Sequence, residues 1–226
     1  MGVECIIIVA RKEDGHPGTL AVIDMQKNER TFNMADTHKL ESPERLQWLP
    51  PDEAVRLLGL RDGMTMADVG AGTGYFAVPF AKAIAPSGRV IAVEPQPEML
   101  EMLRDKLRQP GMPSNILLLQ GTATATELPS ASCDLVFLAN VWHELDNHQA
   151  VLCEAARVVT PGGCIGILDW RSDMAGPPGP PTQHRIGIGQ VISMLQSERW
   201  EVQHSGPFGR YSYIVVASLV RAASSQ

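Results

Sequence analysis

Gly70, Gly72 and Gly74 lie close together, between a short apolar run and an amphipathic stretch. Where a strand leads into a helix, glycines let the backbone approach a ligand and direct the first helical amides toward it. Glu94 stands twenty residues after Gly74, at the end of the next apolar run, where a carboxylate can bind both hydroxyls of a ribose. The loop and the acid together predict a site for a nucleotide-like cofactor.

The glycine pattern fits two kinds of cofactor. Gly72, Gly74 and Ala77 satisfy the loose G-x-G-x-x-G/A pattern of dinucleotide-binding folds. In those folds the first glycine follows the strand directly, which here is Gly70, and counting from Gly70 places Tyr75 at the third glycine position. An NAD-dependent oxidoreductase therefore remains an alternative whose motif is out of phase with the strand.

Polar and aromatic residues follow two later apolar runs. Trp142 and His143 come after the run 134–139, and Asp169 and Trp170 come at the end of the run 164–169. His143 has an unperturbed pKa near neutrality, so it is a candidate proton acceptor, with capping of the next helix as the alternative. We predict His143 and Asp169 as catalytic residues. Trp142 and Trp170 are predicted to line the substrate site, with core packing as the alternative.

Two further residues are candidates for substrate contact. His184 and Arg185 follow a proline-rich segment, and the guanidinium of Arg185 can bind a carboxylate or phosphate. The alternative is an exposed helix start. His143 and His148 are five positions apart rather than the four of H-E-x-x-H, so they would not share a helix face, and we predict no metal site.

The surrounding pattern predicts the elements that position these residues. Apolar runs rich in Val, Ile and Leu alternate with stretches of helical periodicity, which predicts a parallel sheet with helices on both faces. The predicted strands are 66–69, 89–94, 115–120, 134–139 and 164–169, and the predicted helices are 51–58, 75–84, 97–108 and 147–159. After a loop at 176–181, a helix at 186–197 precedes two strands, 200–205 and 211–219, whose short connection makes them antiparallel neighbours.

The bounds of the predicted strands and helices also predict the domain organisation. We expect residues 1–40 to form an extension, either a short β-hairpin or an ill-ordered segment, 41–221 to form one domain, and 222–226 to be a flexible tail. Length and a 44% apolar content allow one sizeable core.

Composition and charge indicate which kinds of molecule the protein could bind. The net charge is -6 and no block of consecutive Lys or Arg is present, which argues against nucleic acid. Cys5, Cys133, Cys153 and Cys164 form no CxxC pair, as expected in a reducing cytoplasm. No apolar run suits membrane insertion. We therefore expect a cytoplasmic protein that acts on a small molecule.

Several motifs resemble the ordered motifs of the class I S-adenosylmethionine (SAM)-dependent methyltransferases. They are residues 68–74, 90–94, 133–139 and the Pro-Gly-Gly turn at 161–163, and the resemblance covers residues 42–219. The segments 45–48, 142–145, 169–170 and 176–178 are similar to a bacterial and archaeal branch related to the ubiquinone and menaquinone methyltransferases. The resemblance implies a Rossmann-like sheet of seven strands with a reversed last strand.

The resemblance also implies roles for individual residues. The three glycines would line the methionine and ribose of SAM, and of its product S-adenosylhomocysteine (SAH). Asp68 would orient the loop and its contacts to the amino group, while Glu94 would hold the ribose. Contacts to the adenine would come from Pro95 and from Thr122 or the backbone at Ala123, where the family's usual acidic side chain is missing. Asn140 would lie beside the sulfonium.

Two variants of this function stay open. A thiol or metalloid acceptor such as arsenite would use cysteines, although Cys153 falls in a predicted helix and Cys164 in a predicted strand, where core packing is expected. The other alternative is a non-catalytic module that binds SAM and uses residues 1–40 to contact a partner.

Overall fold

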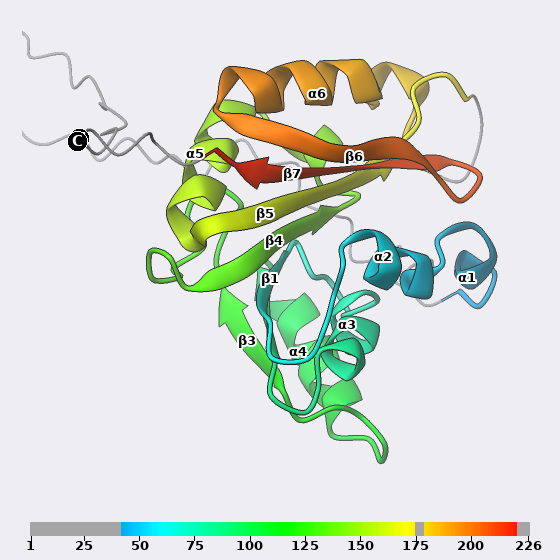
Figure 1. The fold of residues 1–226 in the computed structure, drawn as a ribbon. Helices are drawn as coiled ribbons and strands as arrows, with labels where there is room; N and C mark the ends of the chain where they lie inside the picture. Colours follow the sequence, from blue (N-terminus) through cyan, green and yellow to red (C-terminus); the bar gives the residue numbers. More distant parts are fainter. Residues whose placement is uncertain (1–41, 175–178, 221–226) are drawn as a thin grey trace, which may run out of the picture.

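Seven strands form one sheet in the computed structural model, which describes residues 42–174 and 179–220. The spatial order of the strands is β3-β2-β1-β4-β5-β7-β6 (Figure 1). β1 to β5 run parallel, whereas β7 is antiparallel to both β5 and β6. The strands are β1 (Thr65–Val69), β2 (Arg89–Glu94), β3 (Ile116–Gln120), β4 (Cys133–Ala139), β5 (Val159–Trp170), β6 (Trp200–Phe208) and β7 (Ser212–Leu219). The predicted fold class is confirmed.

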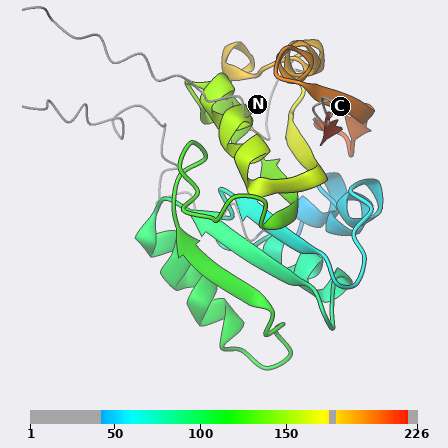
Figure 2. The same ribbon diagram turned by 60° about the vertical axis from the view of Figure 1, so that its left-hand side comes forward.

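Helices cover both faces of this sheet. On one face α2 (Pro51–Leu57), α3 (Ala77–Ala83) and Leu103 of α4 (Pro97–Leu107) contribute to one apolar cluster. On the other, α5 (His148–Val158) and α6 (Ile188–Ser197) contribute to a second cluster and contact each other (Figure 2). The remaining helical elements are α1 (Arg45–Trp48) and the 3₁₀ turns η2 (Trp142–Glu144) and η3 (Thr182–His184).

Local sequence accounts for the elements near the site. In β4, Leu135 and Phe137 face one apolar cluster while Val136 and Leu138 face the other, as a central parallel strand covered on both faces requires. α4 begins with Pro97, and α5 is capped by Asn147, whose Oδ1 accepts the Ala150 amide at 3.0 Å.

Two strands, β5 and β6, extend several residues beyond their predicted bounds. β5 begins at Val159, because Val159 pairs with Cys133 before an irregularity in the ladder. β6 continues through Gly206 and Pro207, which the sequence pattern assigned to a turn. Proline is tolerated there because β6 is an edge strand. The outer side of an edge strand makes no ladder hydrogen bonds, so the N–H group that proline lacks is not needed on that side. The expected hairpin within 1–40, the tail 222–226 and part of the 176–181 loop lie outside the described residues.

Strand register brings the predicted site residues to one edge of the sheet. Val69 pairs with both Val93 and Leu138, and Ala139 pairs with Leu168. The next residue of each segment therefore lies along the edge where the parallel strands end. These residues are Gly70, Glu94, Asn140 and Asp169. We call this the carboxyl edge.

The short helix α1 lies along the carboxyl edge and contacts both of its halves. The guanidinium of Arg45 is 4.1 Å from the ring centroid of Tyr75, directly after the glycine loop, and the Tyr75 hydroxyl donates to the Leu49 carbonyl at 2.7 Å. The ring of Trp48 lies 5.4 Å from that of Trp170 at the end of β5. The segment before the first strand thus joins the two parts of the site.

Candidate cofactor and acceptor site

The glycine loop is held in a conformation that larger residues would disturb. Gly70 and Gly74 have φ values of +74° and +81°, which L-amino acids with a side chain rarely adopt. A Cβ at Gly70 would lie 2.4 Å from Cγ2 of Val141, and one at Gly74 would lie 2.4 Å from Cδ1 of Leu103. The loop is therefore packed directly against the segment after β4 and against α4.

Glu94 binds the glycine loop, although 22 residues separate it from Gly72. Its Oε2 accepts the Gly72 amide at 2.9 Å, and its Oε1 accepts the Gln96 amide at 3.1 Å. The side chain is 5% exposed. The acid and the loop, which together predict one cofactor site from the sequence, form one hydrogen-bonded unit.

Asp68 places a second buried carboxyl beside this unit. It is 2% exposed, and its Oδ2 has no hydrogen-bond partner among the described residues. Burial, with a further contribution from the charge of Glu94, raises its pKa from 3.8 to about 7, against the effect of the Ala77 amide. An unpaired buried carboxyl oxygen is suited to a cationic group.

At the other half of the edge, His143 and Asp169 form a hydrogen-bonded pair. The Nδ1 of His143 lies 2.8 Å from Asp169 Oδ1, and the His143 amide donates to Asp169 Oδ2 at 2.8 Å. The Trp170 amide donates to Oδ1 at 2.7 Å, so three contacts fix a carboxylate that is only 1% exposed. This bond places the Nδ1 proton toward Asp169 and leaves Nε2 as the proton-accepting atom.

The environment of His143 favours its protonated form. Burial lowers the pKa of the imidazole, but the hydrogen bond and charge of Asp169 and the charge of Glu144 outweigh it, so the pKa is raised above 6.5. Glu144 Oε1 lies 3.8 Å from Nε2, and the charge of Arg185 opposes the shift. A histidine held in one orientation by a buried carboxylate is an arrangement that can accept a proton.

Unpaired buried polar atoms gather at the same edge. Among residues 42–174 and 179–220, six buried side-chain N or O atoms have no hydrogen-bond partner: Asp68 Oδ2, Asn140 Oδ1, Trp142 Nε1, Trp200 Nε1, Ser212 Oγ and Tyr213 Oη. Only Trp200, at the start of β6 opposite Leu219, lies at the far end of the sheet. Because proteins satisfy nearly all buried polar atoms, such a concentration marks a place where a ligand supplies the partners.

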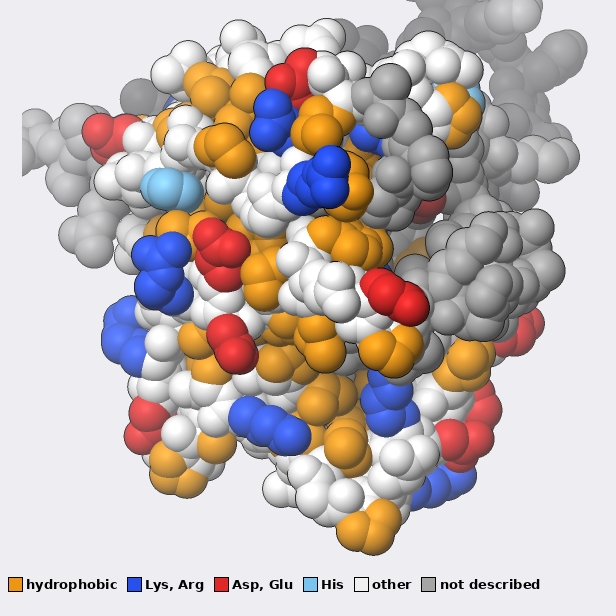
Figure 3. Space-filling view, turned by 90° about the vertical axis from the view of Figure 1, so that its right-hand side faces the viewer, with side chains coloured by type: hydrophobic (Ala, Val, Ile, Leu, Met, Phe, Trp, Pro, Cys, Tyr) orange, Lys and Arg blue, Asp and Glu red, His pale blue; other side chains and the backbone are white. Residues whose placement is uncertain are grey.

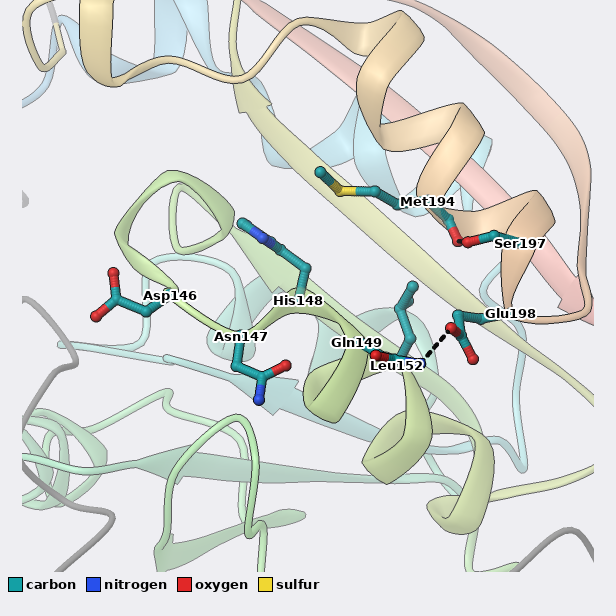
Figure 4. Close-up of a pocket in the computed structure, with 8 residues that line it drawn as sticks. All are labelled: Asp146, Asn147, His148, Gln149, Leu152, Met194, Ser197 and Glu198. Carbon is teal, nitrogen blue, oxygen red and sulfur yellow. Dashed lines mark hydrogen bonds between the residues drawn. The ribbon is translucent and has the colours of Figure 1, made fainter. Parts of the chain in front are cut away.

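A separate surface pocket lies between α5 and α6. Its volume is about 320 Å³, and Asp146, His148, Leu152, Met194 and Glu198 are among the residues that line it. In Figure 4 the hydrogen bond from Gln149 to Glu198 spans the two helices on one side of this pocket. No residue of the glycine loop or of a strand end lines it, so it is not part of the site at the carboxyl edge.

Comparison with known proteins agrees with this geometry. Residues 67–167 match the methyltransferase domain family. A SAM-dependent methyltransferase from Aquifex aeolicus has the same fold, with a TM-score of 0.79, 29% identity, and coverage of 84% of this chain and 100% of that one. Residues 67–167 thus match a methyltransferase domain, and the chain has the fold of the class I SAM-dependent methyltransferases.

Curated relatives share only part of their length with this chain. An uncharacterized methyltransferase of Mycobacterium tuberculosis is 33% identical over 70% of this chain and 62% of its own length. The ubiquinone/menaquinone biosynthesis C-methyltransferase UbiE of Pasteurella multocida is 30% identical over 53% of this chain and 44% of its own length. The chain thus spans less than two thirds of the curated relatives it matches.

The residues at the carboxyl edge fit SAM, on which the matched Aquifex aeolicus methyltransferase depends. The unpaired Oδ2 of Asp68 is suited to the α-ammonium group of the donor, and the positive φ values of the glycine loop bring the backbone close to it. Glu94 ends β2 at the position expected for ribose contact. Asn140, with φ +57° and an unpaired Oδ1, directly follows β4.

The structure places the predicted adenine contacts on one side of Glu94. Pro95 follows it and is half-buried, and Gly121, directly before Thr122, donates its amide to the Glu94 carbonyl at 3.3 Å. Thr122 is half-buried and its Oγ1 accepts the Ala125 amide at 3.1 Å, while Ala123 is buried. Their roles remain predictions.

The predicted substrate residues are not all directed toward the site. Arg185 is 7% exposed and donates to the carbonyls of Pro180, Arg171 and Met174, which ties the segment after β5 together. His184 is exposed. Trp142 is fully buried beside His148, and Trp170 is buried against Trp48. These contacts favour structural roles for Arg185 and Trp142.

Sequence reasoning did not identify two residues of the site. Trp48 was noted only as part of a family motif, yet its ring contacts Trp170 and lies 6.1 Å from Tyr211. Tyr213 lies within the predicted strand 211–219, which gives it no role in the site, yet it pairs with Asp169 across β5 and β7. No local sequence pattern predicts either contact, because both contacts depend on chain segments that are far apart in the sequence.

The positions of Cys133 and Cys164 in the described part of the chain give no support to an acceptor bound by these two thiols. Cys133 begins β4, at the end of the strand far from the carboxyl edge, and Cys164 lies within β5. Burial raises the pKa of both thiols, which keeps them protonated.

Within residues 42–174 and 179–220, no cluster of three His, Cys, Asp or Glu side chains could hold a metal ion. No described helix has the length and apolar content to cross a membrane.

Proposed function

We propose that this protein transfers a methyl group from SAM to a small molecule. The observation that carries the proposal is the joined unit of Asp68, the glycine loop and Glu94 at the carboxyl edge, in a chain that matches a methyltransferase domain. When bound, SAM supplies an electrophilic methyl group. The residues of the chain then need to orient the two reactants, exclude water and accept a proton.

His143 and Asp169 are the residues we propose for proton transfer. Asp169 orients the imidazole through Nδ1, and Nε2 takes a proton from the acceptor. The side chain of His143 is 8% exposed, so this transfer would occur in a water-poor site.

A small-molecule acceptor is favoured by the surface around the site. Figure 3 views the molecule from the side to which β4 and β5 point in Figure 1. Lys and Arg side chains on the part of this face that is not grey are scattered among apolar and acidic ones. That distribution is unlike the continuous basic stripe of a nucleic-acid site.

Thermal unfolding with SAM, SAH and NAD in parallel tests the cofactor. At a hundred times its dissociation constant, a ligand stabilises the native state by about 2.7 kcal/mol, and we expect this with SAM and SAH. Glu94→Gln should lower the affinity for SAH, whereas Glu201→Gln, an exposed position on β6, should not. Stabilisation by NAD alone would overturn the proposal, and SAH binding without transfer to any acceptor would indicate a binding module.

A further inference from the structure

Tyr213 lies in the same cluster as the proposed proton acceptor. In the antiparallel ladder of β5 and β7 it is directly opposite Asp169, so the two side chains project from the same face of the sheet with neighbouring Cβ atoms. Asp169 in turn holds His143. Tyr213 and Trp142, the neighbour of His143, belong to one apolar cluster. Three segments of the chain thus bring an imidazole, a carboxylate and a phenol together.

The hydroxyl of Tyr213 has no partner in the described part of the chain. Tyr213 is 2% exposed, and its Oη makes no hydrogen bond there. Asp169 is not its partner, since no hydrogen bond joins the two side chains; the oxygens of Asp169 accept instead from His143 and from the Trp170 amide. A buried hydroxyl without a partner is costly, which suggests that a ligand completes it.

Tyr213 would act only as a hydrogen-bond donor. Burial first, and then the charge of Asp169, raises the pKa of its phenol, so the group stays protonated throughout the physiological range. Nε2 of His143, in contrast, accepts a proton. The cluster therefore presents one donor and one proton acceptor to a molecule bound at the carboxyl edge.

We propose that the methyl acceptor is a hydroxyl group, with Tyr213 donating a hydrogen bond to its oxygen and His143 receiving its proton. This inference rests on the proposed function. A hydroxyl has both a lone pair for Tyr213 and a proton for Nε2. The hydroxyl oxygen has two lone pairs, so it can accept from Tyr213 and still attack the methyl carbon, whereas an amine nitrogen has only one. A thiol sulfur is a weak hydrogen-bond acceptor, a thioether has no proton to give, and a carbon acceptor has no lone pair for the phenol.

The transfer balances without a further reactant. The acceptor oxygen forms a bond to the methyl carbon as the bond from that carbon to sulfur breaks, and the bonding pair stays on the sulfur. The proton of the hydroxyl moves to Nε2 of His143, and the resulting imidazolium is paired with Asp169 until it releases the proton to solvent. Tyr213 stabilises the negative charge that develops on the oxygen as the proton leaves.

The probe for this site is 4-nitrophenol, whose visible absorption distinguishes the phenol from the phenolate. We expect the SAH complex of the full chain to bind 4-nitrophenol as the phenolate, and to bind its methyl ether, 4-nitroanisole, much more weakly. Tyr213→Phe should weaken 4-nitrophenol binding about tenfold, the effect of losing one hydrogen bond to a charged atom. His143→Gln should abolish ionisation of the bound probe.

Controls separate the proposal from effects on folding and on the cofactor site. Tyr213→Phe should leave SAH affinity unchanged and thermal stability unchanged or raised, because it removes an unpaired hydroxyl. Trp200→Phe removes an unpaired N–H at the opposite end of the sheet and should leave 4-nitrophenol affinity unchanged. Equal probe affinity in wild type and Tyr213→Phe, a neutral bound phenol, or no probe binding by a protein that binds SAH would each overturn the proposal. Failure to bind SAH would instead overturn the proposed function.

Discussion

At the scale of single residues, the site depends on where three carboxyl groups are buried. Asp169 is held by three hydrogen bonds and orients His143, Glu94 is held by two amides, and one oxygen of Asp68 has no partner in the described chain. The same functional group therefore serves to orient a base, to join the glycine loop to β2, and to present an unpaired oxygen. Burial and neighbouring charge decide which role each carboxyl can take.

The hydrogen bond from Asp169 should control the pKa of His143. NMR titration of the imidazole is expected to give a pKa above 6.5 in the wild type, a lower value in Asp169→Asn, and a smaller decrease in Glu144→Gln, whose charge contributes less. Because the folded-state pKa is raised, the stability that the pair contributes is full below pH 6.5 and is lost as pH rises through the raised pKa. Equal shifts in both variants would show that Asp169 has no special role.

Asp68 should make the protein less stable as pH rises. Its pKa is raised from 3.8 to about 7, so its protonated form is favoured in the folded state, and the associated stability is lost between those two values. Asp68→Asn imitates the protonated form. Relative to wild type, we expect the free energy of unfolding of this variant to rise by roughly 2 to 4 kcal/mol between pH 4 and pH 8. Urea unfolding across this range measures the difference, and a difference independent of pH would contradict the shift.

At the scale of elements, the glycine loop and α1 connect the cofactor half of the site to the acceptor half. The loop packs against Val141, which follows β4, and α1 contacts Tyr75 on one side and Trp170 on the other. Both elements therefore contact residues from the two halves of the site.

A pair of glycine substitutions separates backbone strain from steric contact. Gly70→Ala adds a methyl group 2.4 Å from Val141 Cγ2 at φ +74°, whereas Gly63→Ala adds one at φ +86° with no atom within 4 Å. Both variants should lose about 1 kcal/mol to the left-handed conformation. Only Gly70→Ala should also bind SAH at least tenfold more weakly, as calorimetry would show. Equal SAH affinity in the two variants would mean that the contact with Val141 is unimportant.

At the scale of the whole molecule, the domain limits 41–221 remain a prediction that truncation can test. The contacts of α1 begin at Arg45, so a chain without residues 1–40 keeps all of them. We expect that chain to bind SAH as the full chain does and to unfold at the same temperature. A chain without residues 1–50 loses the Arg45–Tyr75 and Trp48–Trp170 contacts and the hydrogen bond to Leu49. It should lose roughly 3 kcal/mol of stability. Loss of SAH binding in the shorter deletion would place part of the domain before residue 41.

The fold could be predicted from sequence because its signals are local. Apolar runs such as 134–139 and the helical periodicity at 97–107 need no distant partner to be recognised, and they specify the alternation of strands and helices. Gly70, Gly72, Gly74 and Glu94 were identified for the same reason, since a strand end followed by glycines has a direct consequence for the backbone.

The acceptor half of the site required the tertiary structure. His143 and Asp169 are 26 residues apart and were proposed separately, and only the pairing of β4 with β5 brings them within hydrogen-bond distance. Tyr213 joins them because β7 turns back antiparallel to β5, while the guanidinium of Arg185 is directed to backbone carbonyls rather than to the site. Sequence periodicity determines which face a residue takes, but strand register and packing determine which residue it meets there.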